Sequence, residues 1–122
     1  MGSMGNGLKD FEITVINIML RRCLPNETVW CVINEAELID LNYSGGNYML
    51  TFRHPALPEQ RNVLSEPFIT GEARGLLVGF TIFLGNQELS IDCHSFNEDA
   101  FLAHREATDR FREWEMEIDI GA

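Results

Sequence analysis

The segment RGLLVGFTIFLGNQELSIDC, residues 74–93, decides the fold class that this sequence predicts. Apolar side chains occupy every second position of its two halves: Val78, Phe80, Ile82 and Leu84, then Leu89, Ile91 and Cys93. This alternation is typical of strands that bury one face. Between the halves, Gly85 and Asn86 are residue types that a tight turn favours. We therefore expect a β-hairpin of residues 74–84 and 88–93, with its inward-facing side chains at the centre of the core.

A second hairpin is expected upstream of the first. Residues 37–43 and 48–53 are rich in apolar and β-branched side chains, and residues 44–47 between them read Ser-Gly-Gly-Asn, which tolerates a positive φ. In the later strand Tyr48, Leu50 and Phe52 share one face. Two further runs predict short strands. One is residues 29–33, and the other is residues 62–69, which Pro67 interrupts and which we place at a sheet edge.

Residues 10–23 are expected to form a helix, with a strand as the alternative. Their polar residues recur at helical spacing on one narrow stripe: Asp10, Thr14, Asn17 and Arg21. Asp10 can cap the start, and Pro25 ends the run. The β-branched residues between positions 13 and 18 favour a strand instead. Because so little of this helix is polar, we expect it to be buried against a sheet or in a dimer interface.

The C-terminal segment predicts a second helix. Asn97 is a favourable cap, and one helical face collects Phe101, Thr108, Phe111, Trp114 and Ile118. Residues 98–119 hold eight acids and three arginines, so the segment carries a net charge of −5, half of the −10 of the whole chain. Met116, Ile118 and Ile120 alternate with acids, and a short final strand is the alternative for this end.

Together these elements predict the α+β class: an antiparallel sheet of about five hairpin-linked strands, with an N-terminal and a C-terminal helix packed on one face in a roll-like arrangement. Hydrophobic residues make up 45% of the 122 residues, enough for one core. We interpret residues 1–3, which precede a second methionine, as a cloning remnant, and residues 4–122 as a single domain.

The charge balance narrows the classes of partner. With 19 acids against 9 bases, the chain opposes direct binding of nucleic acid, which needs surplus cations. It favours a basic protein partner, whose approach the negative charge would steer. The apolar runs are too short for a membrane span. Three cysteines without a paired motif indicate free thiols in a reducing compartment, so we expect a cytoplasmic protein without membrane contact.

Two short stretches are similar to motifs of known families. Residues 42–46, Asn-Tyr-Ser-Gly-Gly, resemble the [DN]-x-S-x-x-G signature of PilZ domains, which bind cyclic di-GMP, but Asn47 stands in place of the last glycine, and the arginine pair of that family is missing. Residues 34–38, Asn-Glu-Ala-Glu-Leu, are similar to an opening seen in small β-rich bacterial immunity-type proteins, without its histidine. No phosphate-binding loop is present, and we expect no cofactor.

The candidates for chemistry are few. Asp92, Cys93 and His94 are adjacent, but in a strand Cys93 points away from the other two, so we assign it to the core. His54 lies at a strand end. The acids Glu35, Glu37 and Asp40 lie within six residues, and we interpret them as a solvated edge that discourages aggregation rather than as paired catalytic acids. The sequence thus contains no assembled catalytic or metal-binding motif.

Three hypotheses on function follow. The first is a small acidic, non-enzymatic interaction protein, an inhibitor or immunity-type factor that binds a basic partner through a C-terminal face of Glu106, Asp109, Glu113, Trp114 and Glu117. The second is a small-molecule-binding or catalytic roll with a pocket between the sheet and the N-terminal helix, lined by His54, Asp92 and His94. The third, homodimerisation through residues 10–23, is compatible with either.

Overall fold

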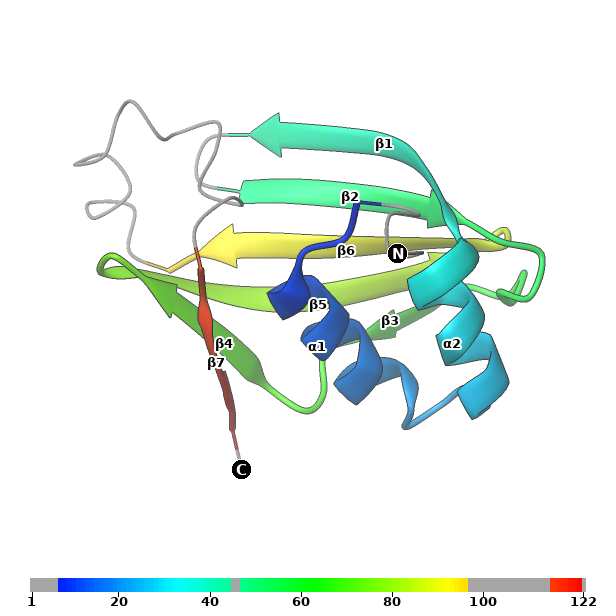
Figure 1. Cartoon of the computed structure of the whole chain (residues 1–122), viewed down its shortest axis with the longest axis horizontal. Coiled ribbons are helices and arrows are strands. Elements are labelled where there is room, and N and C mark those ends of the chain that lie inside the picture. Colours follow the sequence, from blue (N-terminus) through cyan, green and yellow to red (C-terminus); the bar gives the residue numbers. More distant parts are fainter. Residues whose placement is uncertain (1–6, 45–46, 97–114, 122) are drawn as a thin grey trace.

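A computed structural model describes residues 7–44, 47–96 and 115–121. These residues form a seven-stranded antiparallel sheet and two helices, so the expected α+β class is confirmed, with more strands than expected (Figure 1). The elements are α1 (Asp10–Leu20), α2 (Asn26–Glu35), β1 (Glu37–Ser44), β2 (Asn47–Arg53), β3 (Asn62–Leu64), β4 (Ile69–Ala73), β5 (Leu76–Gly85), β6 (Glu88–Ser95) and β7 (Glu117–Ile120).

The strands follow the order β1-β2-β6-β5-β4-β7, and β3 pairs with β5. Both predicted hairpins, β1–β2 and β5–β6, are confirmed. The turn of the second hairpin lies one residue later than expected. Gly85 pairs with Glu88, and the two turn residues are Asn86 and Gln87, with φ of 57° and 58°. Positive φ at both positions is the geometry of the turn that matches strand twist.

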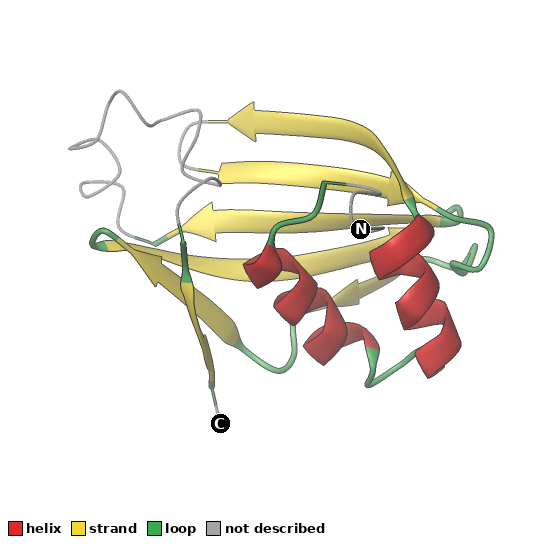
Figure 2. Ribbon diagram, viewed as in Figure 1, coloured by secondary structure: helices red, strands yellow, loops and turns green. Residues whose placement is uncertain are grey.

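Both helices pack on one side of the sheet (Figure 2), which we call the helix face; the opposite side is the open face. The core lies between α1 and the helix face, where the inward side chains of β2, β5 and β6 are fully or almost fully buried. The helical prediction for residues 10–23 is confirmed through Leu20. Its predicted polar stripe is the exposed side of α1, because Asp10 and Thr14 are exposed while Val15 and Ile16 are buried.

The strand predicted at residues 29–33 is wrong, because these residues lie within α2. The buried positions, Val29 and Val32, are three residues apart, which is helical spacing, and Trp30 between them is exposed. The β-branched composition favours a strand, but the segment follows α1 after a short link and packs against it, which buries Val29 and Val32. Tertiary packing therefore overrides the local propensity.

The strand predicted over residues 62–69 is split in two. β3 pairs with one end of β5, through Leu64 and Ile82, and β4 pairs with the other end, through Thr70 and Gly79. Pro67 lies between them, where it has no ladder hydrogen bond to donate. The expected interruption is confirmed, and both short strands lie along the same side of β5. The expected edge position is wrong for β4, which lies between β5 and β7, whereas β3 pairs only with β5 among the described strands.

The C-terminal helix is not supported. Most of its predicted span, residues 97–114, lies outside the described residues, and the end of the chain forms β7 instead, paired with β4. The alternative of a short final strand is thus confirmed, with Gly71 opposite Ile118 and Ile69 opposite Ile120. Both described helices precede the sheet in the chain, rather than one lying at each end.

A buried carboxylate that the sequence did not reveal anchors α1 to the sheet. Glu12 is completely buried; one of its oxygens accepts the backbone N–H of Lys9 at 2.9 Å, and the other accepts the Tyr48 hydroxyl at 2.5 Å. Asp10, which we expected to cap the helix, is its first residue. The N-cap is Lys9, and Glu12 accepts the backbone N–H of Lys9. Cys93 pairs with Tyr48 across β2 and β6, and desolvation, aided by the charge of Glu12, raises the pKa of its thiol.

Replacing the tyrosine tests this anchor. Tyr48→Phe leaves one buried oxygen of Glu12 without its donor, so we expect the free energy of unfolding to fall by about 1–3 kcal/mol in urea denaturation. The matched control is Thr51→Val, which removes the 2.8 Å hydrogen bond to Ser90 from the same strand at a partly exposed position. Thr51→Val should lower the free energy of unfolding by less than Tyr48→Phe does. Equal losses for the two variants would contradict the role of Glu12.

Candidate functional site

The edge of the sheet formed by β1 is the first candidate surface among the described residues. β1 is the first strand of the sheet and, among the described residues, pairs only with β2. Its other side therefore presents backbone N–H and C=O groups to solvent, as edge strands do. We call this strand, with its side chains from Glu37 to Leu41, the β1 edge surface.

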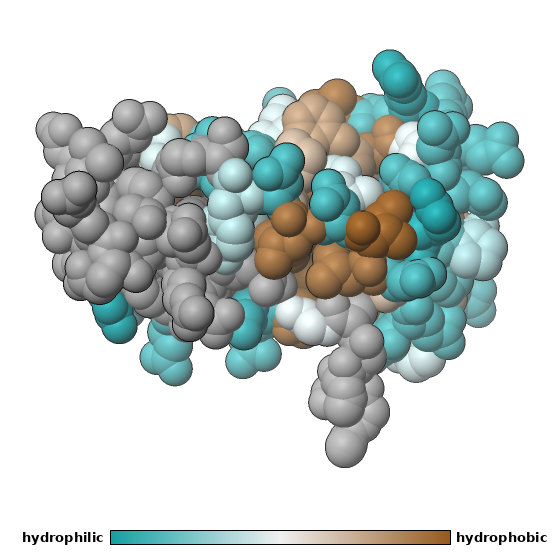
Figure 3. Space-filling model, turned by 90° about the horizontal axis from the view of Figure 1, so that it is seen from above, coloured by the Kyte–Doolittle hydropathy of each residue, from teal (hydrophilic) through white to brown (hydrophobic). Residues whose placement is uncertain are grey.

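Apolar side chains are exposed along this edge. Leu38, Ile39 and Leu41 have exposed fractions of 37%, 37% and 42%. Figure 3 looks down on the edge that β1 forms, and hydrophobic surface gathers there between hydrophilic side chains. The register shifts between Leu38 and Asp40, which bulges the strand at this point. A bulge bends an edge strand and limits its pairing with other strands. This apolar edge is therefore less open to non-specific strand addition than a regular strand would be.

The charge along this edge is negative. Glu35, Glu37 and Asp40 are exposed, which confirms the expected solvated position of these acids. β1 itself contains no lysine or arginine. The arginine opposite Glu37 in β2, Arg53, forms an ion pair with Glu88 at 2.7 Å. An approaching chain therefore meets apolar side chains together with Glu37 and Asp40, which form no ion pair with another described residue.

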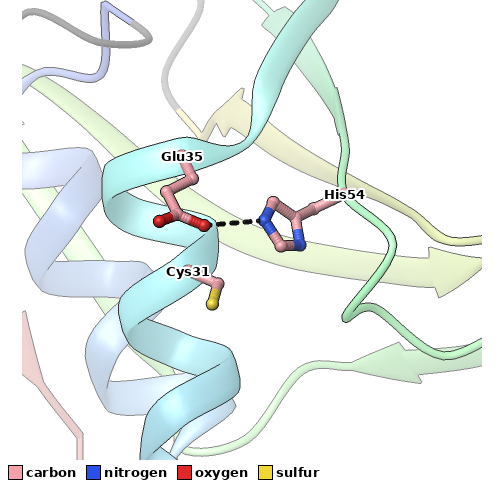
Figure 4. A group of neighbouring side chains, drawn as sticks. All are labelled: Cys31, Glu35 and His54. Carbon is pink, nitrogen blue, oxygen red and sulfur yellow. Dashed lines mark hydrogen bonds and ion pairs between the residues drawn. The ribbon is translucent and has the colours of Figure 1, made fainter.

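A second candidate is a cluster of Cys31, Glu35 and His54 (Figure 4). Cys31 and Glu35 lie one turn apart on the last part of α2, so both side chains project from the same side of the helix. His54 follows β2 and points toward them. One donor atom from each residue lies within 4.8 Å of the other two. The cluster joins two segments 19 residues apart in the chain at the base of the β1–β2 hairpin.

Hydrogen bonds fix the imidazole of His54. Its Nδ1 accepts the backbone N–H of Ala56 at 3.0 Å, and its Nε2 lies 3.1 Å from Oε1 of Glu35. An Nδ1 that accepts a hydrogen bond carries no proton, so Nε2 is the protonated nitrogen and donates to Glu35. The Leu57 N–H donates to the His54 carbonyl at 3.0 Å and closes the turn that holds the ring.

The thiol of Cys31 is held in its neutral form. Desolvation raises its pKa, and Glu35 raises the pKa further through its negative charge and by accepting a hydrogen bond from the thiol. A nucleophilic cysteine needs the opposite, a neighbouring base or cation that lowers the pKa. Both nitrogens of His54 are also engaged, with Ala56 and Glu35, and neither is directed at the sulfur. The cluster is therefore not a catalytic triad.

The predicted pocket of His54, Asp92 and His94 is not assembled. Asn47 and Arg53, at the two ends of β2, pair with His94 and Glu88, so the length of β2, about 20 Å, separates His94 from His54. The expected pairing of Asp92 with His94 is present, at 2.8 Å. Because Cys93 is buried in the core, its two neighbours lie on the open face, away from α1.

A groove does lie beside α1, but with other residues. Its volume is about 860 Å³, and it runs between the start of α1 and the strands β4 and β7. Phe11, Ala73, Met116 and Ile118 supply its apolar lining, and charged groups of both signs, from Lys9 to Glu117, supply the rest. None of the three predicted pocket residues lines it. Because the lining mixes apolar, acidic and basic side chains, it does not indicate one class of ligand.

Of the predicted interaction face, the structure describes one residue. Glu117 is exposed on β7, at the sheet edge opposite to β1. Glu106, Asp109, Glu113 and Trp114 lie outside the described residues. Neither the β1 edge surface nor the place of Cys31 in the cluster was identified from the sequence. The spacing of Cys31 and Glu35 carries information only when residues 26–35 are taken as a helix.

No helix among the described residues is long and apolar enough to cross a membrane.

The electrostatic effect of Glu35 on Cys31 is testable. In a Cys23→Ser background Cys31 is the accessible thiol, because Cys93 is buried. Glu35→Gln removes the charge that raises the pKa of Cys31, so more thiolate forms at a given pH, and alkylation by iodoacetamide at pH 8 should be faster. Glu27→Gln, which removes a smaller contribution, is the matched control and should accelerate the reaction less. An unchanged rate in Glu35→Gln would contradict the contact.

Comparison with protein-family models, with curated proteins and with solved structures gives no match for this chain.

Proposed function

We propose that the protein is a non-enzymatic interaction module that binds an extended segment of a basic protein partner along β1. The observation that carries this proposal is the β1 edge surface, an eight-residue strand with exposed apolar and acidic side chains and one described strand neighbour. A peptide added to a sheet edge gains affinity from main-chain hydrogen bonds and specificity from alternate side chains. An inhibitor or immunity-type factor can act in this way.

Charge complementarity supports a basic partner. The exposed acids at this edge, Glu37 and Asp40, add to a net charge of −10 for the whole chain. A partner strand with lysine or arginine beside apolar residues would neutralise these acids and cover Leu38, Ile39 and Leu41. The negative field would also speed the encounter, an effect that salt weakens.

A second copy of the chain is the less favourable occupant. Two β1 strands paired with each other would bring the acids of both copies together, with no lysine or arginine in either strand to offset them. α1 also offers few exposed apolar side chains, since Phe11, Val15 and Ile16 are buried in the core of the chain itself and are not free to form a dimer interface.

The cellular setting that we propose is the cytoplasm. All three cysteines are free, at positions that range from exposed to buried. Free thiols fit a reducing compartment.

A synthetic strand tests the proposal. The probe is a fluorescent peptide as long as β1, eight residues, in which lysine alternates with valine. We expect saturable binding in anisotropy titrations that weakens from low to high salt, and amide chemical-shift changes in NMR spectra that centre on β1. Two control peptides should bind much more weakly: one with glutamate in place of lysine, and one with N-methyl groups on alternate amides.

Charge reversals in two strands provide matched variants. Asp40→Lys changes the charge of the β1 edge surface, and we expect affinity for the peptide to fall about fivefold, the size of one or two exposed ion pairs. Glu72→Lys makes the same change at an exposed position of β4, far from β1, and should bind as the unaltered chain does. Equal losses in both variants, or shifts that map away from β1, would overturn the proposal. So would shifts on β1 that depend on protein concentration alone, which would identify a second copy as the occupant.

A further inference from the structure

The cluster of Cys31, Glu35 and His54 has the spacing of a partly formed metal site. Zinc bonds of 2.0–2.2 Å to nitrogen and oxygen, arranged tetrahedrally, place two such donors about 3.3 Å apart. Nε2 of His54 and Oε1 of Glu35 already lie 3.1 Å apart. The third donor, the sulfur of Cys31, lies within 4.8 Å of the other two donor atoms. To reach bonding distance the sulfur would have to move closer by rotation about the Cα–Cβ bond of Cys31, which leaves the backbone in place.

The elements that carry the three donors are well fixed. Cys31 and Glu35 occupy adjacent turns of α2. The helix ends at Glu35, and the next residue, Ala36, donates its N–H to the Cys31 carbonyl at 3.1 Å. His54 is held in a closed turn at the end of β2. The side chain of Glu35 is half exposed, whereas that of His54 is 14% exposed, so the site opens to solvent on the side of the carboxylate.

We propose that Cys31, Glu35 and His54 bind one Zn²⁺ ion, with a water molecule in the fourth position. Sulfur, imidazole nitrogen and carboxylate oxygen are the three donor types that zinc accepts in proteins, and three protein ligands with one open position is a common zinc arrangement. Calcium and magnesium prefer sites made of oxygen alone. The three donors lie outside the β1 edge surface, and the test of the site does not involve a partner.

Binding has a defined proton balance. The S–H bond of Cys31 breaks, a Zn–S bond forms, and the proton leaves to the buffer. At His54 the ion takes the place of the proton on Nε2, and the imidazole keeps one proton, which moves to Nδ1. There it faces the N–H of Ala56, so that hydrogen bond is given up. One proton is released per ion, so affinity rises with pH while the free thiol is protonated.

Cobalt provides the direct measurement, because a Co²⁺–thiolate bond gives an intense charge-transfer band. The full chain, freed of metal with a chelator, is titrated with Co²⁺ and then with Zn²⁺. We expect one equivalent of Co²⁺ to produce the thiolate band and Zn²⁺ to remove it. Cys31→Ser should abolish the band, and His54→Gln should lower affinity at least about tenfold. Cys23→Ser and His94→Gln remove the same residue types elsewhere and should bind as the unaltered chain does.

A second experiment measures how Zn²⁺ protects Cys31 from alkylation. It uses the unaltered chain, so it remains valid if a variant fails to fold. Saturating Zn²⁺ should slow the alkylation of Cys31, followed by mass spectrometry, while Cys23 in the same sample reacts at its usual rate; a chelator should restore the reaction of Cys31. NMR should show the Ala56 amide shifting with the ion. The proposal is overturned if no thiolate band forms, if the band persists in Cys31→Ser, or if Zn²⁺ protects both cysteines equally.

Discussion

The pairing of β6 on both sides is the constraint on which the remaining structure depends. Seven residues of β2 and eight of β5 pair with β6 in continuous register, so its inward side chains Leu89, Ile91 and Cys93 are fixed at the middle of the sheet. The helix face that results is apolar and must be covered, and α1 and α2 cover it. The same pairing leaves β1 at one end of the strand order, where β2 is its only strand partner among the described residues. An exposed edge is thus the consequence of a well-formed centre.

The polar groups of the core are placed by this register as well. Because Tyr48 lies opposite Cys93, its hydroxyl reaches the first turn of α1 and meets Glu12. A buried carboxylate is costly unless its oxygens are hydrogen-bonded, and here both are. The contact selects one position of the helix on the sheet, which apolar packing alone would specify less sharply. The sheet therefore determines where α1 lies, and through the short link after Leu20 it also determines the position of α2.

Much of the sheet could be predicted from the sequence, since the period-two alternation in residues 48–53 and 74–93 is unambiguous and each hairpin has a suitable turn. The helix at α1 followed from its polar stripe. α2 did not, because Val29 to Ile33 are β-branched or aromatic in large part, and their choice of helix depends on a neighbour that only the fold supplies. The candidate sites depend on contacts between distant segments. Cys31 and His54 are unremarkable in the sequence, and they meet only because α2 ends beside the turn that follows β2.

A single buried residue, Ala36, separates Glu35 in the cluster from Glu37 at the start of β1. An ion held by Glu35 and a strand held by β1 would therefore act on the same short piece of backbone. Thermodynamic linkage makes any such coupling reciprocal: the free energy by which the ion strengthens capture of the strand equals that by which the strand strengthens capture of the ion. A metal bound at this junction would make partner affinity depend on the supply of that metal, and partner binding would in turn retain the metal.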